Sequence, residues 1–162
     1  MFLRIARFTA LLFLALVLGL GLASLIGADA RADVLGRVFL TVQQVVYQDL
    51  ERLQGLGELV SFIAVLFALL CVVRRKPFFI MTLLSCVCVA VVIGLRFFSI
   101  RPLHQVIASW SVENIPDTWM SVRNRYYLFA TIRAGFSILG FCSLSLSVLF
   151  DTPQYRVKNK VA

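Results

Sequence analysis

Four stretches of the chain are strongly apolar and long enough to cross a membrane as helices. They predict spans over about 8–28, 54–73, 77–97 and 128–150. A helix rises 1.5 Å per residue, so roughly 20 apolar residues cover the roughly 30 Å of hydrocarbon in a bilayer. The pattern therefore predicts an all-α integral membrane protein, a four-helix bundle that forms a single domain over 1–162.

The first apolar stretch has a second interpretation, as a secretory signal peptide. Arg4 and Arg7 would form its basic region, and Ala28-Asp29-Ala30 would offer a cleavage site. The apolar core of a signal peptide runs roughly 7–15 residues, and 8–28 is longer. We therefore favour an uncleaved spanning helix and leave cleavage open.

Small residues recur at every fourth position along the first predicted span. They are Ala15, Gly19, Ala23 and Gly27. This spacing places them on one stripe of a helix, where a second helix can approach closely. The stripe predicts helix packing, including contact between copies in a homo-oligomer.

The segments between the spans are more polar. Leu35, Val38, Val42, Val45 and Leu53 fall near helical spacing and predict an amphipathic helix over about 34–53, in the first outer loop. A connector of about 30 residues is expected between the third and fourth spans, punctuated by Pro102, Trp110, Pro116 and Trp119. A basic tail over 152–162 ends the chain.

Composition and charge agree with a membrane protein. Hydrophobic residues make up 60% of the chain and the mean hydropathy is +0.92, whereas soluble domains are roughly 45–50% apolar. The net charge of +8 is best explained by topology, which makes a nucleic-acid partner a poor interpretation. One side of the membrane collects the basic residues Arg4, Arg7, Arg74, Arg75, Lys76, Arg156, Lys158 and Lys160 with a single acid, Asp151. Both termini are therefore predicted to be cytoplasmic, in an inner (plasma) membrane.

Metal and cofactor sites are not indicated. The four cysteines, Cys71, Cys86, Cys88 and Cys142, all lie within apolar stretches, where cysteine acts as a small hydrophobic residue. A zinc site would also need histidines, and the chain has one. No glycine-rich phosphate loop follows a strand. We expect neither a metal nor a cofactor.

Three charges fall within the spans, where ionisable residues are costly and often functional. Helical rise places Glu58, Arg96 and Arg133 about 24–30 Å from the basic side, so they should lie at similar depth. Glu58 is expected to pair with Arg133, with Arg96 as second partner. The cluster is either a structural ion pair, a ligand-binding cavity that includes Arg101, or a set of side chains that extend to water.

The only histidine lies near the same predicted outer surface. His104 follows Arg101-Pro102 and has an unperturbed pKa near neutrality. A lone interfacial histidine is more often solvated than catalytic. His104 and Glu58 are nevertheless the candidate acid–base residues of the chain.

One set of residues is similar to a known family. It comprises Gln43-Gln44, Glu58, Arg101-Pro102-Leu103-His104, Trp110, Pro116, Trp119, Arg123, Arg125 and Arg133. In order and spacing this set resembles the anthrone oxygenase-like family of small four-helix membrane proteins, much of which is known only as a domain of unknown function. The resemblance covers most of the chain after residue 40. The resemblance implies a four-helix membrane protein. The fungal members of the family oxidise anthrones to anthraquinones.

The chain departs from the family pattern at three positions. His104 stands where the family has Asn, Tyr126 where it has Trp, and Ala130 where it has His three residues before an arginine. A histidine that would transfer protons is therefore missing at 130. Whether the chain is an enzyme is left open.

Three functions remain, in order of preference. The first is binding of a small ligand or a membrane partner at the Glu58, Arg96, Arg101 and Arg133 cluster. The second is a cofactor-independent oxygenase or oxidoreductase of the anthrone oxygenase-like type. The third is a small transporter subunit, which would need oligomerisation to enclose a pathway.

Overall fold

The computed structural model describes residues 2–30, 36–45, 47–73, 76–111 and 113–151. Over these ranges the chain is helical apart from its turns, with no strand beyond an isolated bridge between Ser111 and Asn114, and the all-α prediction is confirmed. The basic tail predicted over 152–162 lies outside the described residues. In chain order the elements are α1 (Phe2–Ala30), α2 (Gly36–Val45), α3 (Tyr47–Val72), α4 (Lys76–Leu95), the π-helix η1 (Arg96–Ile100), α5 (Arg101–Ala108) and α6 (Trp119–Phe150).

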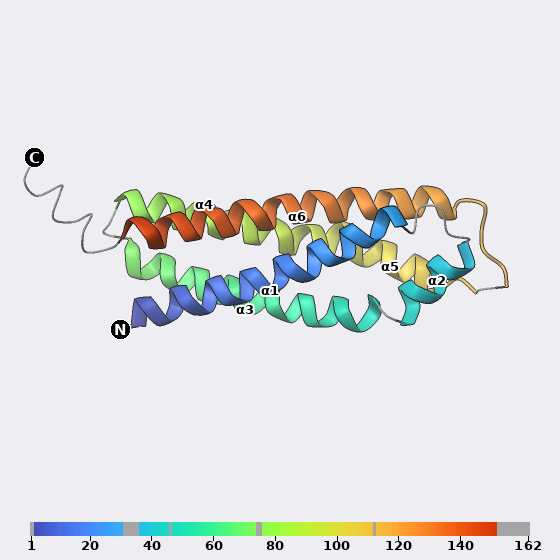
Figure 1. The fold of residues 1–162 in the computed structure, drawn as a ribbon, viewed down its shortest axis with the longest axis horizontal. Helices are drawn as coiled ribbons and strands as arrows, with labels where there is room; N and C mark the ends of the chain where they lie inside the picture. The colour runs from blue at the N-terminus through green and yellow to red at the C-terminus, as the bar shows by residue number, and fades with distance from the viewer. Residues whose placement is uncertain (1, 31–35, 46, 74–75, 112, 152–162) are drawn as a thin grey trace, which may run out of the picture.

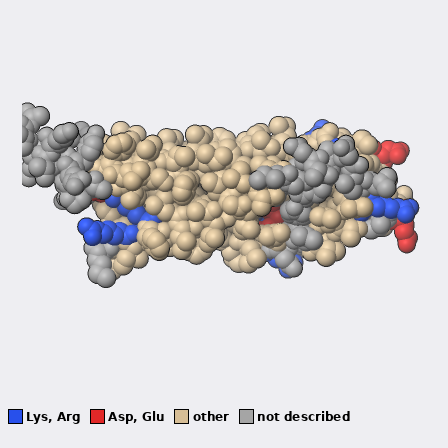
Figure 2. Space-filling model, viewed as in Figure 1, with Lys and Arg blue, Asp and Glu red and all other residues tan. Residues whose placement is uncertain are grey.

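Four helical stretches are long and apolar enough to cross a membrane, among the residues described. They are Phe2–Ala23, Leu50–Val72, Pro77–Ala108 and Trp119–Phe150, and each overlaps one predicted span. The long helices lie side by side, with α1 and α4 each packed against both α3 and α6 (Figure 1). On the face shown in Figure 2, a long uncharged stretch separates the Lys and Arg side chains at the left end from the next charged side chains, which begin with an acid just right of the middle. Length and composition thus support a multi-pass membrane protein.

The connector of about 30 residues predicted between the third and fourth spans is mostly helical, and its non-helical part is much shorter. The helix continues from α4 through η1 into α5, so that only 109–118 separate α5 from α6. Pro102 is the second residue of α5 and has no N–H to donate, and the helix continues past it where the hydrogen bonds change from the π to the α pattern. The π-turn before it, in which the Arg101 N–H donates to the Arg96 carbonyl, provides the local widening that the proline ring needs.

Small side chains allow α4 and α6 to pack closely. A Cβ atom at Gly140 would lie 3.2 Å from the Cβ of Cys88, so a larger residue there would separate the helices. The Thr82 and Ser147 hydroxyls are 3.0 Å apart within this contact. Small residues and hydroxyl hydrogen bonds are typical of helix contacts in membranes.

The small-residue stripe of α1 lies on the surface of the molecule. Ala15, Gly19 and Ala23 are exposed, and a Cβ at Gly19 would meet no other atom within 4 Å. The side-chain surroundings of Gly27 lie outside the description. The stripe therefore does not pack the helices of this chain against one another where it is described, and its use between copies stays a prediction.

A second, smaller core closes the end of the molecule where α2 and α5 lie. Phe39 and Leu40 of α2 pack against Ile107 of α5, and Trp110 and Trp119 cover them. Gln44 joins α2 to the end of α5, because its Nε2 donates to the carbonyl oxygens of Ile107 at 3.2 Å and Trp110 at 3.0 Å. The Ile107 carbonyl belongs to the last turn of α5 and the Trp110 carbonyl lies just after it, so Gln44 supplies a donor at the end of a helix, where backbone acceptors run out of helical partners.

The segment predicted as an amphipathic helix, 34–53, is divided between two elements. Its first part forms α2, which turns Phe39, Leu40 and Gln43 inward and leaves Val38 and Val45 exposed. Leu35, which the prediction also used, lies outside the described residues. Residues 47–53 form the first turns of α3 instead. This continuation carries Glu51 on the same helix as Glu58.

Candidate functional site

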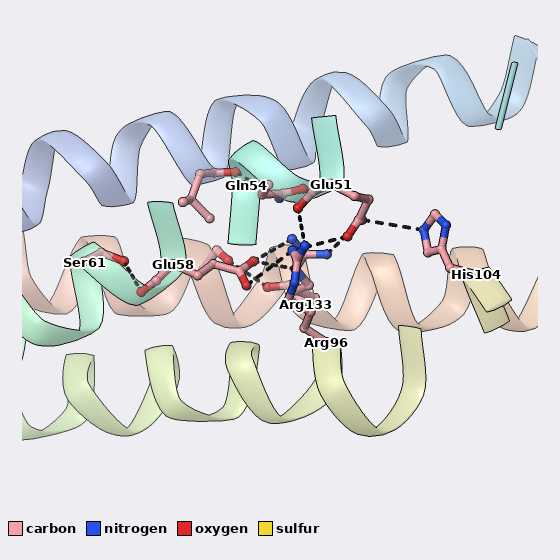
Figure 3. A network of polar contacts seen from close by, with 9 residues as sticks. Glu51, Gln54, Glu58, Ser61, Arg96, His104 and Arg133 are labelled. Atoms are coloured by element: carbon pink, nitrogen blue, oxygen red, sulfur yellow. Dashed lines mark hydrogen bonds and ion pairs between the residues drawn. The ribbon is translucent and has the colours of Figure 1, made fainter. Parts of the chain in front are cut away.

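Four charged side chains meet near the α2 and α5 end of the long helices (Figure 3). Glu51 and Glu58 come from α3, Arg96 from η1 and Arg133 from α6. The two glutamates are seven residues apart, about two turns, so they share one face of α3. We call these four residues the charged cluster.

Glu58 and Arg133 form the buried centre of the charged cluster. The Glu58 Oε1 accepts from Arg133 Nε at 2.9 Å and from Arg133 Nη2 at 2.5 Å. Glu58 is 1% exposed and Arg133 5% exposed. The pair expected from their equal depth is therefore present, whereas its role in binding or chemistry stays a prediction.

Arg96 links the two glutamates. Its Nη1 lies 3.2 Å from Glu51 Oε2 and 3.6 Å from Glu58 Oε2, and its Nη2 donates to the Glu51 backbone carbonyl. Glu51 also lies 3.4 Å from Arg133 Nη1 through its Oε1. Two positive and two negative side chains thus alternate, which compensates the cost of removing each charge from water.

Gly55 makes room for the Arg96 side chain. A Cβ atom at this position would lie 2.6 Å from the Arg96 Cζ and 2.6 Å from its Nη2. Real Cβ atoms do not approach so closely, so any side chain at 55 would displace the guanidinium. The absence of a side chain at Gly55 therefore determines where Arg96 can lie.

His104 joins the charged cluster through Glu51 and not through Glu58. Its Nε2 lies 3.9 Å from Glu51 Oε1, beyond hydrogen-bond distance, and this nitrogen is buried without a hydrogen-bond partner among the described residues. The imidazole ring meets the Tyr126 ring edge-on, with centroids 5.1 Å apart. The imidazole thus lies near the Glu51 carboxylate and against the Tyr126 ring.

A pocket of about 460 Å³ opens next to the charged cluster, and we call it the end pocket. Three arginines and one glutamate supply the charges of its lining, which comprises Gln43, Gln44, Glu51, Arg52, Arg96, Phe97, Arg101, His104, Gln105, Ile107 and Ala108. The guanidinium of Arg101 lies over the Phe97 ring, 5.7 Å from its centroid. Arg101 thus belongs to the pocket wall.

Gln43 contributes a second buried nitrogen to the end pocket. The residue is 4% exposed, and its side chain lies beside the Tyr126 hydroxyl. Its Nε2 has no acceptor at good hydrogen-bond geometry in the described ranges, and the Tyr126 hydroxyl is a polar group that the side chain meets. Buried amide nitrogens are normally hydrogen-bonded, so this atom and His104 Nε2 are suited to oxygen atoms of a ligand.

A second pocket, of about 360 Å³, lies between α3 and the α4–η1 helix, and we call it the lateral groove. Its lining is mostly apolar and comprises Arg52, Gly55, Leu56, Glu58, Leu59, Ile93, Arg96 and Phe97. Glu58 lines this groove and not the end pocket. The two predicted acid–base residues, Glu58 and His104, therefore do not face the same space.

The sequence interpretation missed Glu51, Gln43 and Tyr126. Glu51 had an available signal, because its seven-residue spacing from Glu58 puts both on one helical face. The prediction of a separate helix over 34–53 places Glu51 and Glu58 on different helices and so hides this spacing. Gln43 and Tyr126 stand among the positions compared with the anthrone oxygenase-like family, but a single polar residue in a helix does not reveal which neighbour it meets.

Another buried ion pair lies at the opposite end of the molecule. Arg7 Nη1 of α1 is 2.7 Å from the Asp151 Oδ2 just after α6, with side chains 8% and 5% exposed.

In the described part of the chain, no three His, Cys, Asp or Glu side chains gather as metal ligands. The buried Cys86 and Cys88 are free thiols.

Comparisons with known proteins do not add to this picture. No protein-family model matches the chain, and neither the curated proteins nor the solved structures yield a match.

Proposed function

We propose that this chain is a four-helix membrane bundle that binds a small anionic ligand in the end pocket. The observation that carries the proposal is the charge of the pocket lining, in which three arginines outnumber one glutamate. In addition, the buried side-chain nitrogens of Gln43 and His104 lack a hydrogen-bond acceptor at good geometry among the described residues. Carboxylate or phosphate oxygens would satisfy both nitrogens and pair with the guanidinium groups.

The charged cluster prepares the end pocket for binding. The Arg96 guanidinium is paired with Glu51 and occupies the room that the missing side chain of Gly55 leaves. It therefore loses little conformational freedom when a ligand binds. A binding group that is already ordered costs less conformational entropy at the moment of association. Glu58 and Arg133 support this arrangement as a buried ion pair that links α3 to α6 across the bundle.

The topology of this proposal follows the distribution of basic residues. Arg4 and Arg7 precede the first span, and the basic tail follows the last. By the positive-inside rule, both termini would lie in the cytoplasm and the protein in the inner membrane. The end pocket would then open on the outer side, and an anionic ligand would reach it from there. The exposed Ala15, Gly19 and Ala23 stripe would serve contact between copies.

Replacing Arg101 with Gln should weaken binding of a simple anionic probe. Arg101 is exposed and lines the end pocket, so its loss removes one positive charge without leaving a buried acid unpaired. We expect the dissociation constant of ethyl phosphate to rise about fivefold in R101Q, which corresponds to about 1 kcal/mol for a partly solvated charged contact. Isothermal titration of the protein in phosphatidylcholine nanodiscs measures it.

Arg123→Gln is the matched control for that experiment. Arg123 also lies over an aromatic ring, 5.0 Å from the Trp119 centroid, but it does not line the end pocket. R123Q should bind ethyl phosphate as the wild type does. Equal losses in both variants, or no binding by the wild type above empty discs, would overturn the proposed function.

A second candidate function, the cofactor-independent oxygenase, is favoured by one observation. Glu51 and His104 both line the end pocket, and Glu51 Oε1 lies 3.9 Å from His104 Nε2, so a carboxylate and an imidazole, the groups that general acid–base catalysis uses, stand beside the ligand space. The three positions at which the chain departs from the family pattern all lie close to Glu51. His104 contacts Tyr126, and Ala130 lines a space of about 10 Å³ together with Glu51 and Tyr126.

This candidate predicts turnover that depends on His104. Incubated with anthrone and dioxygen, the protein should produce anthraquinone, followed by its absorbance, and H104Q should reduce the rate by roughly 10²–10⁴-fold, the range for loss of a general base. R123Q should turn over as the wild type does. An absence of anthraquinone above the uncatalysed rate would refute an anthrone oxygenase activity.

A further inference from the structure

The end pocket and the lateral groove share one wall. Arg52, Arg96 and Phe97 line both, so the two spaces lie on either side of the same three side chains. The lining changes character across this wall. Gln43, Arg101 and His104 surround the end pocket, whereas Leu56, Leu59 and Ile93 line the lateral groove.

The lateral groove runs from the charged end toward the middle of the spans. Along α3 the lining proceeds from Arg52 through Gly55 to Leu59, and along the neighbouring helix from Phe97 back to Ile93. Arg52 and Leu59 are seven residues apart, about 10 Å of helix. Leu56 and Leu59 are 62% and 45% exposed, so the groove opens on the outer surface of the helices.

The order of the two spaces matches the structure of a membrane lipid. A lipid places its polar head at one end of the bilayer and its chain toward the middle. Here the arginine-lined pocket lies at the end of the spans and the apolar groove leads inward from it. A soluble anion would need only the end pocket and would make no use of the groove.

We infer that the ligand is an amphiphile with an acidic head group and a single alkyl chain, and that it enters sideways from the bilayer. This inference rests on the proposed function and specifies its ligand class. The head group, a phosphate or a carboxylate, lies among Arg96, Arg101 and His104, where its oxygens also accept from Gln43. The chain passes Phe97 and lies along Leu59 and Ile93.

Leu59→Trp tests the chain site without changing any charge. An indole at position 59 fills the lateral groove and should raise the dissociation constant of dodecyl phosphate about tenfold, because the chain can no longer lie beside its head group. Binding is measured in phosphatidylcholine nanodiscs against empty discs. Leu66→Trp is the matched control, since Leu66 lies two turns further along the same face of α3, is 41% exposed and lines neither space. L66W should bind dodecyl phosphate as the wild type does.

Ethyl phosphate separates failure of the chain site from failure of the whole pocket. It carries the same head group without a long chain, and L59W should bind it as tightly as the wild type. If dodecyl phosphate binds L59W and the wild type equally, the chain site is wrong and the anion pocket stands. If neither probe binds above empty discs, the proposed function fails as well.

Dodecanoate distinguishes the source of the head group. If it also loses about tenfold in affinity in L59W, a fatty acid carboxylate is accepted along with a phosphate. If only dodecyl phosphate responds, the site is selective for a phosphate head. Both outcomes support the acidic amphiphile, and a response confined to dodecyltrimethylammonium, a cation, would overturn it.

Discussion

Glu58→Gln should lower the free energy of unfolding by about 3–5 kcal/mol, the largest effect expected of any single substitution in the chain. The mutation leaves the Arg133 guanidinium buried, at 5% exposed, with only the more distant Glu51 as an acidic partner. Breaking one side of a buried ion pair is costly because the remaining charge keeps its desolvation penalty. Denaturant titration in detergent, followed by circular dichroism, measures the loss.

The double variant E58Q/R133Q distinguishes an ion pair from two independent residues. If the two side chains stabilise each other, removing both should recover part of the loss, with a coupling energy of roughly 0.5–3 kcal/mol. Strictly additive losses would refute the pairing. Glu113→Gln is the control for the chemical change, because Glu113 is exposed in the turn between α5 and α6 and should shift stability by no more than about 0.5 kcal/mol.

Gly55→Ala should reduce ligand binding although it changes no charge and adds only a methyl group. The new Cβ would lie 2.6 Å from the Arg96 Cζ, so the guanidinium must leave its place between Glu51 and Glu58. Hydrogen bonds to charged groups contribute about 1.5–3 kcal/mol, so affinity for ethyl phosphate should fall roughly 10–100-fold. The same nanodisc titration measures this change.

Gly94→Ala is the matched control for that substitution. Gly94 lies in α4 just before Arg96, and a Cβ there would meet no atom within 4 Å. Both changes gain helix propensity, so a difference between them reports the displaced arginine. If G55A binds ethyl phosphate as tightly as G94A, the position of Arg96 has no part in binding.

The spans could be predicted from the sequence because length and lack of charge are properties of the chain itself. The Glu58–Arg133 pair could also be predicted, since helical rise gives the depth of each residue and opposite charges at one depth attract. The connector after Arg96 could not. Pro102 reads as a helix break, and only the π-turn before it shows why the helix continues.

The end pocket was beyond prediction for a different reason. The spans are apolar on every side, so their hydrophobic pattern does not show which face turns inward. Gln43 and His104 line one pocket because α2 packs onto α5 through Phe39 and Leu40 against Ile107. Such a contact between short helices is set by tertiary packing, which no local pattern records.

Identifying what co-purifies with the protein tests most directly whether the end pocket binds an acidic ligand. The protein should be extracted with its native lipid in polymer discs, and the bound molecules identified by mass spectrometry for the wild type, R101Q and R123Q. We expect an acidic molecule in stoichiometric amount with the wild type and R123Q, and a reduced amount with R101Q. Discs that carry the same bulk lipid in all three, with no enriched acidic molecule, would contradict a ligand site in this pocket.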